Sequence, residues 1–147
     1  MLIEELIKKD NIKVKVKVND WEDAVKKVGE LLLNDGSIDK QYIDNMINSV
    51  KTLGPYIVLT QGFALAHAAA NNEIVHKPSV SMITLENPIN FGSPNDPVKV
   101  VMCIACIDQS THIDTLSKIA NKLMKENFLD EVYKSDTIEE LYNVINN

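Results

Sequence analysis

The sequence predicts a single α/β domain in which a mixed, mostly parallel sheet is flanked by helices. Segments with the two-residue period of a strand alternate along the chain with segments that have the period of a helix. Two strand-like runs are apolar at nearly every position, as expected of strands buried on both faces. Because the chain has only 147 residues, with no linker and no internal repeat, we expect residues 1–147 to form one domain.

The first half of the chain predicts a strand followed by two helices. Ile12–Val18 alternates apolar residues with lysines, which is typical of an edge strand with one wet face. Asp20 can cap a helix that Asn34–Gly36 ends, and a second helix follows Ser37 and ends at Leu53–Pro55. The residues expected to face the core are Trp21, Ala24, Val25, Val28, Leu31 and Leu32 in the first helix, and Ile38, Tyr42, Ile43, Met46, Ile47 and Val50 in the second.

The second half predicts three strands and two more helices. The strands are Ile57–Thr60, Ser79–Leu85 and Val98–Ile107; residues 61–70 are expected to form a small-residue loop, and residues 87–97 a turn-rich connection. Capping boxes at Thr111 and Asp114 and at Thr137 and Glu140 each predict a helix start. The expected inward residues are Leu116, Ile119, Ala120, Leu123 and Met124 in one helix, and Ile138, Leu141, Tyr142 and Ile145 in the other.

Charge and hydropathy exclude several classes of protein. A net charge of −6 has the wrong sign for binding nucleic acid through its phosphates. Neither a signal peptide nor a bilayer-spanning stretch is evident, so we expect a soluble, cytoplasmic protein. Cys103 and Cys106 lie three apart in a strand-like run and therefore point to opposite faces, which favours structural cysteines over a redox or zinc pair.

Acidic residues are missing from one long stretch of the chain. Residues 45–72 contain no Asp or Glu, although one acid in seven residues overall would place four there. A carboxylate in contact with a phosphoryl group repels it by roughly 1 to 4 kcal/mol, so phosphate chemistry favours such a window. A helix end followed by a buried strand would also exclude acids, and the composition alone leaves both interpretations open.

Two histidines are candidates for the chemistry. His67 lies in the glycine-containing segment between alanines, where we expect it to be accessible, and a neutral imidazole is a good nucleophile. His112 lies at the start of a predicted helix, where a ring donor could bind an anion, although a plain surface residue would fit the same position. His76 is expected to be a surface residue without function.

Several common sites have no support in the sequence. No combination of His, Cys, Asp and Glu has the spacing of metal ligands, so we expect no metal site. The chain has neither a P-loop nor G-x-G-x-x-G, and no G-x-S-x-G, so we expect no nucleotide cofactor and no hydrolase of that type.

Five segments together resemble a known family. They are Gly54–Leu59, Gly62–Ala68, Glu86–Gly92, Asn95–Val98 and Ser110–His112. In this order they resemble the EIIA component of the bacterial sugar phosphotransferase system, of the mannitol/fructose structural type and closest to its ascorbate-specific branch. The resemblance covers nearly the whole chain and implies a mixed sheet flanked by helices.

The resemblance also implies a function. His67 would be the phosphoacceptor through Nε2, loaded by the histidine-containing phosphocarrier protein HPr and unloaded onto a cysteine of a cognate EIIB for uptake of ascorbate or a related sugar. His112 would lie beside it and stabilise the phosphoryl group. No cofactor or metal is implied, and contact with the membrane would be indirect, through the permease complex.

Two positions depart from the family pattern. The family usually has proline where this chain has Ala66, and ascorbate-type members often have arginine where it has Ala69. These departures keep open an alternative: a regulatory module that signals to a protein partner through its phosphorylation state. Because docked partners must exclude water from the phosphoryl group, we expect Phe63, Leu65 and Phe91 to form an apolar rim around His67.

Overall fold

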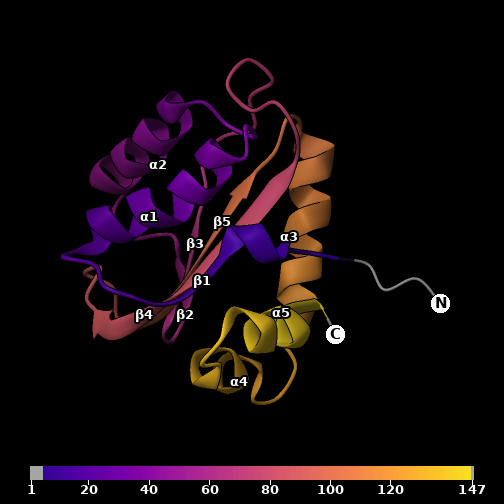
Figure 1. Ribbon diagram of the computed structural model, residues 1–147. Helices are drawn as coiled ribbons and strands as arrows, with labels where there is room; N and C mark the ends of the chain where they lie inside the picture. The colour runs from indigo at the N-terminus through magenta and orange to yellow at the C-terminus, as the bar shows by residue number, and fades with distance from the viewer. Residues whose placement is uncertain (1–4, 147) are drawn as a thin grey trace.

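The computed structural model describes residues 5–146, which form a five-stranded sheet with helices on both faces (Figure 1). In chain order the elements are the 3-10 turn η1 (Lys9–Asn11), β1 (Ile12–Val16), α1 (Trp21–Asn34), α2 (Lys40–Leu53), β2 (Val58–Thr60), β3 (Phe63–Ala66), β4 (Ser79–Ile89), β5 (Val98–Ala105), α3 (Gln109–Leu123), α4 (Phe128–Lys134) and α5 (Ile138–Asn146).

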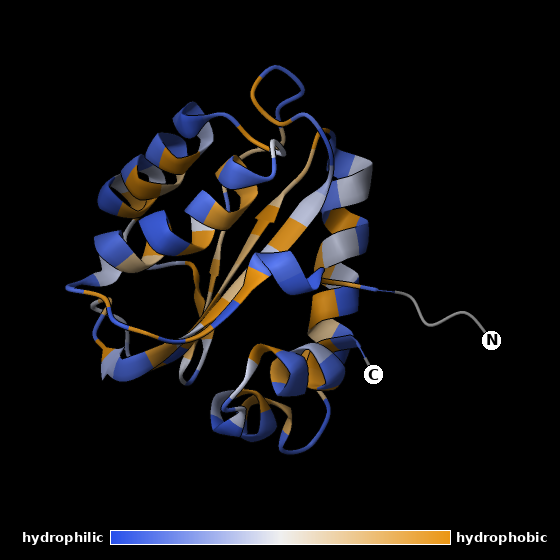
Figure 2. Ribbon diagram, in the orientation of Figure 1, coloured by the Kyte–Doolittle hydropathy of each residue, from blue (hydrophilic) through white to orange (hydrophobic). Residues whose placement is uncertain are grey.

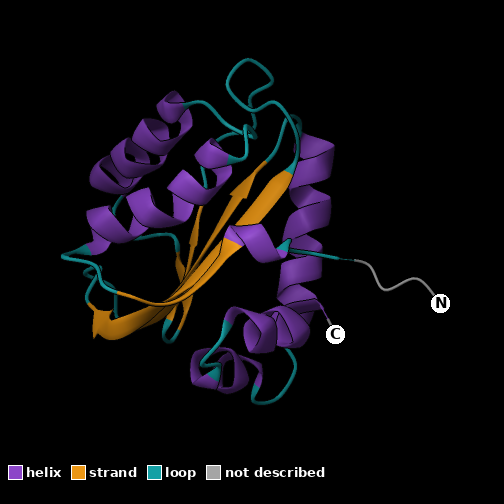
Figure 3. Ribbon diagram, in the orientation of Figure 1, coloured by secondary structure: helices purple, strands orange, loops and turns teal. Residues whose placement is uncertain are grey.

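The sheet is mixed, as predicted, with strand order β1-β4-β5-β3-β2. β1 pairs with β4 and β3 with β5 in parallel, whereas β4 with β5 and β2 with β3 are antiparallel. The long strands β4 and β5 lie in the interior of the sheet, and β1 forms one edge (Figure 3). The lysines of β1 are exposed, as expected. No helix of the described part of the chain is long and apolar enough to cross a membrane.

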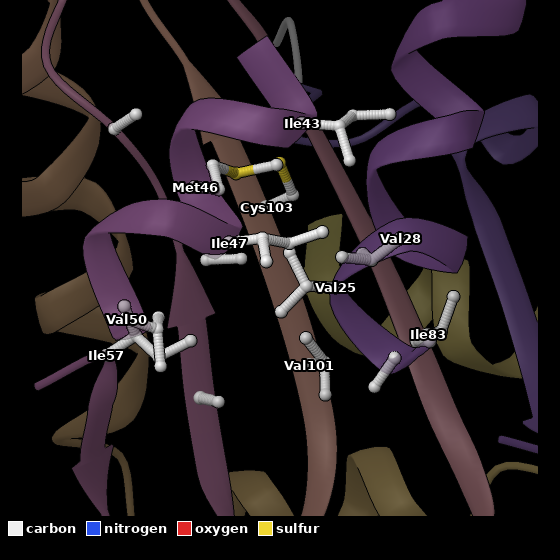
Figure 4. Packing of buried hydrophobic residues seen from close by; sticks show 14 of the residues in the cluster. Val25, Val28, Ile43, Met46, Ile47, Val50, Ile57, Ile83, Val101 and Cys103 are labelled. Atoms are coloured by element: carbon white, nitrogen blue, oxygen red, sulfur yellow. The ribbon is translucent and has the colours of Figure 1, made fainter. Parts of the chain in front are cut away.

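The two faces of the sheet are covered by different helices because successive side chains of a strand point to opposite sides. Ala64, Val101 and Cys103 pack with α1 and α2 (Figure 4), whereas Leu65 and Met102 pack with the side of α3, α4 and α5. The central strands are therefore apolar on both faces, while the helices alternate apolar and polar residues around their axes (Figure 2). This arrangement confirms the predicted helix-sheet-helix layers.

The first two predicted helices are confirmed, and the first cap has the expected geometry. The Asp20 side chain accepts a hydrogen bond from the Asp23 N–H, and Asp23 in turn accepts one from the Asn19 N–H. α2 begins at Lys40, so Ile38 precedes the helix and bridges Val75 instead. Both apolar stripes face the sheet, although Trp21 is only partly buried.

Three elements differ from the sequence predictions. Residues 63–66 form the buried strand β3 rather than a loop, because their backbone pairs with β5 on one side and with β2 on the other. β4 continues to Ile89, so Asn87 and Pro88 belong to its exposed end rather than to the turn. The helix α4 was not predicted; it has only seven residues and follows Asn127, whose backbone is left-handed.

The start and the inward face of α3 were also predicted wrongly. The helix begins at Gln109, and Asp108 caps it by accepting a hydrogen bond from the Thr111 N–H, so Thr111 is not the cap. Asp108 lies three residues after the end of β5 and offers a side-chain acceptor earlier in the chain than Thr111 does. Only Ile119 is fully buried; Leu116 and Leu123 pack partly against the sheet, whereas Ala120 and Met124 (81% exposed) lie outside the stripe that the sheet covers.

The C-terminal helix is confirmed, with Thr137 accepting a hydrogen bond from the Glu140 N–H, although Ile138 is exposed. Its last described residue, Asn146, joins the two ends of the fold. The Asn146 amide oxygen accepts from the N–H groups of Leu6 and Ile7, and its NH₂ donates to the carbonyls of Ile7 and Tyr142. Because this side chain is buried, its loss would leave backbone groups without partners.

We expect Asn146→Ala to lower the free energy of unfolding by about 2 to 3 kcal/mol, because buried backbone donors lose their acceptor. Asn143→Ala is the matched control, since Asn143 is exposed on the same helix, and we expect a change within about 0.5 kcal/mol. Urea unfolding curves of both variants measure the effect, and equal midpoints would contradict the assigned role.

Candidate phosphoryl-transfer site

Two histidines from different parts of the chain meet at one edge of the sheet. His67 directly follows β3, and His112 lies in the first turn of α3, shortly after β5. Since β3 and β5 are parallel neighbours, both segments leave the sheet at the same edge. The centroids of the two imidazole rings lie 5.8 Å apart at an interplanar angle of 51°. The structure thus brings together both predicted site residues.

The backbone fixes the tautomer of His67. Its Nδ1 lies 2.7 Å from the carbonyl oxygen of Leu65, and a carbonyl can only accept a hydrogen bond. Nδ1 therefore bears the proton of the neutral ring, which leaves the lone pair on Nε2. The sequence predicted an accessible His67, but the structure shows that it is partly buried. The arrangement gives a neutral imidazole one defined nucleophilic nitrogen.

Burial keeps this imidazole neutral. Desolvation lowers the pKa of His67 below its ordinary value of 6.5; the hydrogen bond to Leu65 opposes this shift, and the nearby His112 reinforces it. A ring that stays unprotonated at neutral pH retains its lone pair. The environment therefore favours nucleophilic chemistry over proton storage.

A buried tyrosine holds the backbone next to His67. The Tyr42 hydroxyl accepts a hydrogen bond from the Ala68 N–H at 3.0 Å and donates one to the Ile104 carbonyl at 2.7 Å. It thereby ties the residue after His67 to the end of β5. Burial raises the pKa of Tyr42 above its ordinary range, so the hydroxyl keeps the proton that it donates. A further link joins the Asn71 N–H to the Cys106 carbonyl at 3.2 Å.

A second tyrosine lies against the His67 ring. Tyr56 meets it edge to face, with centroids 5.4 Å apart, and its hydroxyl donates to the His67 carbonyl at 3.4 Å. Sequence reasoning assigned no site role to Tyr42 or Tyr56. The signal was available for Tyr42, because a tyrosine in an apolar helical stripe needs a partner for its hydroxyl.

One ring nitrogen of His112 lacks a hydrogen-bond partner in the described part of the chain. Among residues 5–146, His112 Nδ1 is one of three buried side-chain nitrogen or oxygen atoms without a hydrogen-bond partner. The start of α3 is less open to an anion than predicted, because the Asp108 carboxylate already accepts from the Thr111 N–H. That hydrogen bond holds the pKa of Asp108 below its ordinary value. His112 itself, rather than the helix end, is therefore the group available to an incoming ligand.

The predicted apolar rim of Phe63, Leu65 and Phe91 is wrong, because all three side chains are buried. Phe63 and Leu65 belong to the core on the α3 side, and Phe91 packs against Trp21 with ring centroids 6.3 Å apart. Phe91 lies in the connection between β4 and β5, which is at the opposite ends of the strands from His67.

The apolar side chains that remain exposed near the two histidines come from their neighbours instead. Tyr56, which packs on the His67 ring, is 38% exposed, and Ile113, next to His112 in the chain, is 63% exposed. Apolar groups beside a reactive ring are available to a docking partner.

The remaining candidates lie apart from this chemistry. Lys51, the one charged residue of the acid-free window, pairs with Glu22 at 2.8 Å, and His76 is exposed and contacts Asp39. Both cysteines are buried and free, and burial raises the pKa of Cys103 to about 12. In the described part of the chain, no group of three or more His, Cys, Asp or Glu side chains is arranged to bind a metal ion.

The similarity of this chain to known proteins covers nearly its whole length. The sequence model of the family described as "Phosphoenolpyruvate-dependent sugar phosphotransferase system, EIIA 2" matches residues 5–147. The ascorbate-specific PTS system EIIA component of Salmonella choleraesuis is 29% identical over 146 residues, which cover 98% of this chain and 94% of that protein.

Solved structures agree with this match. The mannitol-specific cryptic phosphotransferase enzyme IIA of Escherichia coli aligns over 99% of both chains, with 24% identity and a TM-score of 0.87. The mannitol enzyme IIA of Escherichia coli, solved in complex with phosphorylated enzyme IIB, aligns over 95% of this chain and 96% of that one, with 22% identity and a TM-score of 0.82. Both structures therefore share the fold of this chain.

We expect Tyr42→Phe to lower the free energy of unfolding by about 2 to 3 kcal/mol, because the buried Ala68 N–H and Ile104 carbonyl both lose their partner. Tyr56→Phe is the control; its hydroxyl is exposed and makes one long hydrogen bond, so we expect a change below about 0.5 kcal/mol. Chemical denaturation measures the stability of both variants. An equal loss of stability in Tyr42→Phe and Tyr56→Phe would refute the proposed role of the Tyr42 hydroxyl.

The lowered pKa of His67 predicts a pH dependence of stability. Between the lowered folded-state pKa and the unfolded-state value near 6.5, the unfolded chain binds more protons, so stability falls as the pH drops through this window. NMR titration of the ring C–H signals should place His67 below 6.5, with His67→Gln identifying its resonances. His112→Gln should raise the His67 pKa, because it removes a repelling ring; an unchanged or lower value would contradict the coupling.

Proposed function

Since the chain belongs to the EIIA 2 family of the phosphoenolpyruvate-dependent sugar phosphotransferase system, and is thus a phosphotransferase component of it, we propose that His67 is its phosphoryl carrier. One observation supports the choice of residue and atom above all: the hydrogen bond from Nδ1 to the Leu65 carbonyl, which directs the lone pair to Nε2. The neighbouring His112 ring, 5.8 Å away, completes the proposed site.

The proposed transfer needs no proton to leave His67. The Nε2 lone pair attacks the phosphorus of a phosphohistidine on the donor protein, the donor's N–P bond breaks, and its histidine regains the electron pair. The phosphorylated ring of His67 keeps its proton on Nδ1, and the Leu65 carbonyl accepts a hydrogen bond from this N–H and stabilises the positive charge of the ring. In the second step a cysteine thiolate attacks the phosphorus, and the N–P bond of His67 breaks.

His112 is proposed to stabilise the phosphoryl group during both steps. Its ring is adjacent to that of His67, and its buried Nδ1 has no partner within residues 5–146. A phosphoryl oxygen near this ring would meet a group whose hydrogen-bonding capacity is not yet used. Preorganised donors of this kind stabilise developing charge without rearrangement, which is the main contribution that a protein makes to phosphoryl transfer.

The proposed partners are HPr as donor and the cysteine of a cognate EIIB as acceptor, in a pathway for ascorbate or a related sugar. The ascorbate-specific name of the Salmonella relative supports the sugar, and the complex of the mannitol enzyme IIA with phosphorylated enzyme IIB supports the acceptor class. The exposed side chains of Tyr56 and Ile113 would pack against either partner and exclude water from the phosphoryl group.

We expect the protein to take up one acid-labile phosphoryl group from phosphorylated HPr, and His67→Gln to take up none. His112→Gln should still be labelled but about 10²-fold more slowly, because one stabilising donor is lost. His76→Gln is the matched control and should behave as wild type, since His76 is exposed and its ring contacts Asp39 rather than either of the other two histidines. Mass spectrometry and quenched time courses measure the label and its rate.

The outcomes separate the alternatives. A labelled wild type that discharges rapidly to an ascorbate-type EIIB supports transport; label that persists with every EIIB tested favours the regulatory alternative. Label retained in His67→Gln would refute the assignment of the carrier residue, and unlabelled wild type would refute both functions.

A further inference from the structure

A cavity of about 650 Å³ begins at Thr115 of α3, one helical turn after His112. Its walls come from the N-terminal segment around Glu5–Asn11, the turn after α1, the start of β4, the part of α3 from Thr115 onward with Lys125 after it, and Asn146 at the end of α5. Neither His67 nor His112 lines it. The volume falls in the range of small-molecule sites, and the proposed phosphoryl transfer makes no use of it.

The walls of this cavity are basic in an otherwise acidic protein. Five of the fifteen lysines of the chain line it, namely Lys8, Lys77, Lys118, Lys122 and Lys125. Burial, and then the neighbouring charge of Lys125, lower the pKa of Lys122, which agrees with cations gathered in a partly desolvated space. Such a wall attracts an anion.

The two carboxylates that line the cavity already have hydrogen-bond donors. Glu5 accepts from the Tyr142 hydroxyl. Asp35 accepts from Asn11 Nδ2 at 3.1 Å and from the Ser37 N–H and hydroxyl. Burial raises the pKa of Asp35, but the hydrogen bonds from Ser37 and Asn11 outweigh it and hold that pKa below its ordinary value. The positive charge of Lys77 also lowers the pKa of Asp35, and Lys118 pairs with Asp114 at 3.3 Å, so acids offset part of the basic wall. The five lysines of the wall still outnumber its two carboxylates.

Two buried polar atoms of the wall lack partners among residues 5–146: Asn11 Oδ1 and Ser79 Oγ. Asn11 is only 3% exposed, and its amide orientation is fixed because Nδ2 donates to the Asp35 carboxylate. The orphaned Oδ1 is consequently an acceptor that requires a donor. Inorganic phosphate can donate only from the group that the lysines would hold, whereas a sugar anion carries hydroxyl donors several bonds away from its anionic group.

We propose that this cavity binds a small anion that also carries hydroxyl groups, that is, a sugar phosphate or a sugar acid. Its phosphate or carboxylate would bind at the lysines, and its hydroxyls would donate to Asn11 Oδ1 and bond Ser79 Oγ. This chemistry satisfies both the basic wall and the two buried polar atoms, which neither a simple anion nor a neutral sugar does.

The test uses the full chain and four probes at constant ionic strength: glucose 6-phosphate, gluconate, inorganic phosphate and glucose. Calorimetry measures affinity, and amide chemical shifts of Asn11 and Ser79 locate binding. We expect glucose 6-phosphate, gluconate or both to bind saturably and at least about 10-fold more tightly than phosphate or glucose. Comparing the first two identifies which anionic group the lysines prefer.

Matched variants test the residues. Lys77→Gln with Lys125→Gln should weaken binding by about 10-fold or more, whereas Lys40→Gln with Lys134→Gln changes the net charge equally on exposed positions outside the cavity and should leave it within about twofold. Ser79→Ala removes a hydroxyl that has no partner in the described structure, so it should weaken binding without loss of stability. His67→Gln should bind normally, which separates this site from the proposed function.

Three results would overturn the proposal: no saturable binding of either sugar anion at millimolar concentration, equal affinity for inorganic phosphate or glucose, or shifts confined to the surroundings of His67 and His112. Equal weakening by the pocket and control lysine pairs would likewise refute it, because general attraction to the surface would then account for the binding.

Discussion

The parallel pairing of β3 with β5 is the constraint on which the rest of the site depends. It makes two segments, separated by more than 40 residues in the chain, leave the sheet at one edge, and so places the His67 ring beside that of His112. The Leu65 carbonyl that orients His67 belongs to β3, and the Ile104 carbonyl bonded to Tyr42 belongs to β5. The reactive geometry is therefore a property of the core, since the residues that orient the rings are themselves buried strand residues.

The sequence predicted those features that depend on local periodicity or on a single side-chain chemistry. The alternating lysines of β1, the Asp20 cap of α1 and the run of β5 have patterns that few other structures produce. The two histidines were found because nucleophilic chemistry needs their residue type, and the resemblance to a family supplied their relation to each other. Both histidines could be identified without knowing which strands pair.

What could not be predicted depends on contacts between distant segments. β3 is a run of only four residues, all of them apolar, so its hydropathy does not alternate, and its pairing with the strands on both sides is what makes it a strand. Phe63, Leu65 and Phe91 were predicted to form an apolar rim because docked partners must exclude water from a phosphoryl group on His67. Their burial follows from strand alternation and from the direction of β4, neither of which is visible near His67 in the chain.

The hydrogen bonds of Asn146 have a topological consequence. Leu6 and Ile7 lie against the last turn of α5, so the backbone nearly closes into a ring through one amide side chain. Such a ring can be opened elsewhere without altering a core contact. A circular permutant that links Leu6 to Asn146 and begins at an exposed residue of the connection between β4 and β5, such as Pro94, would retain the place where His67 and His112 meet, because that connection lies at the opposite ends of the strands.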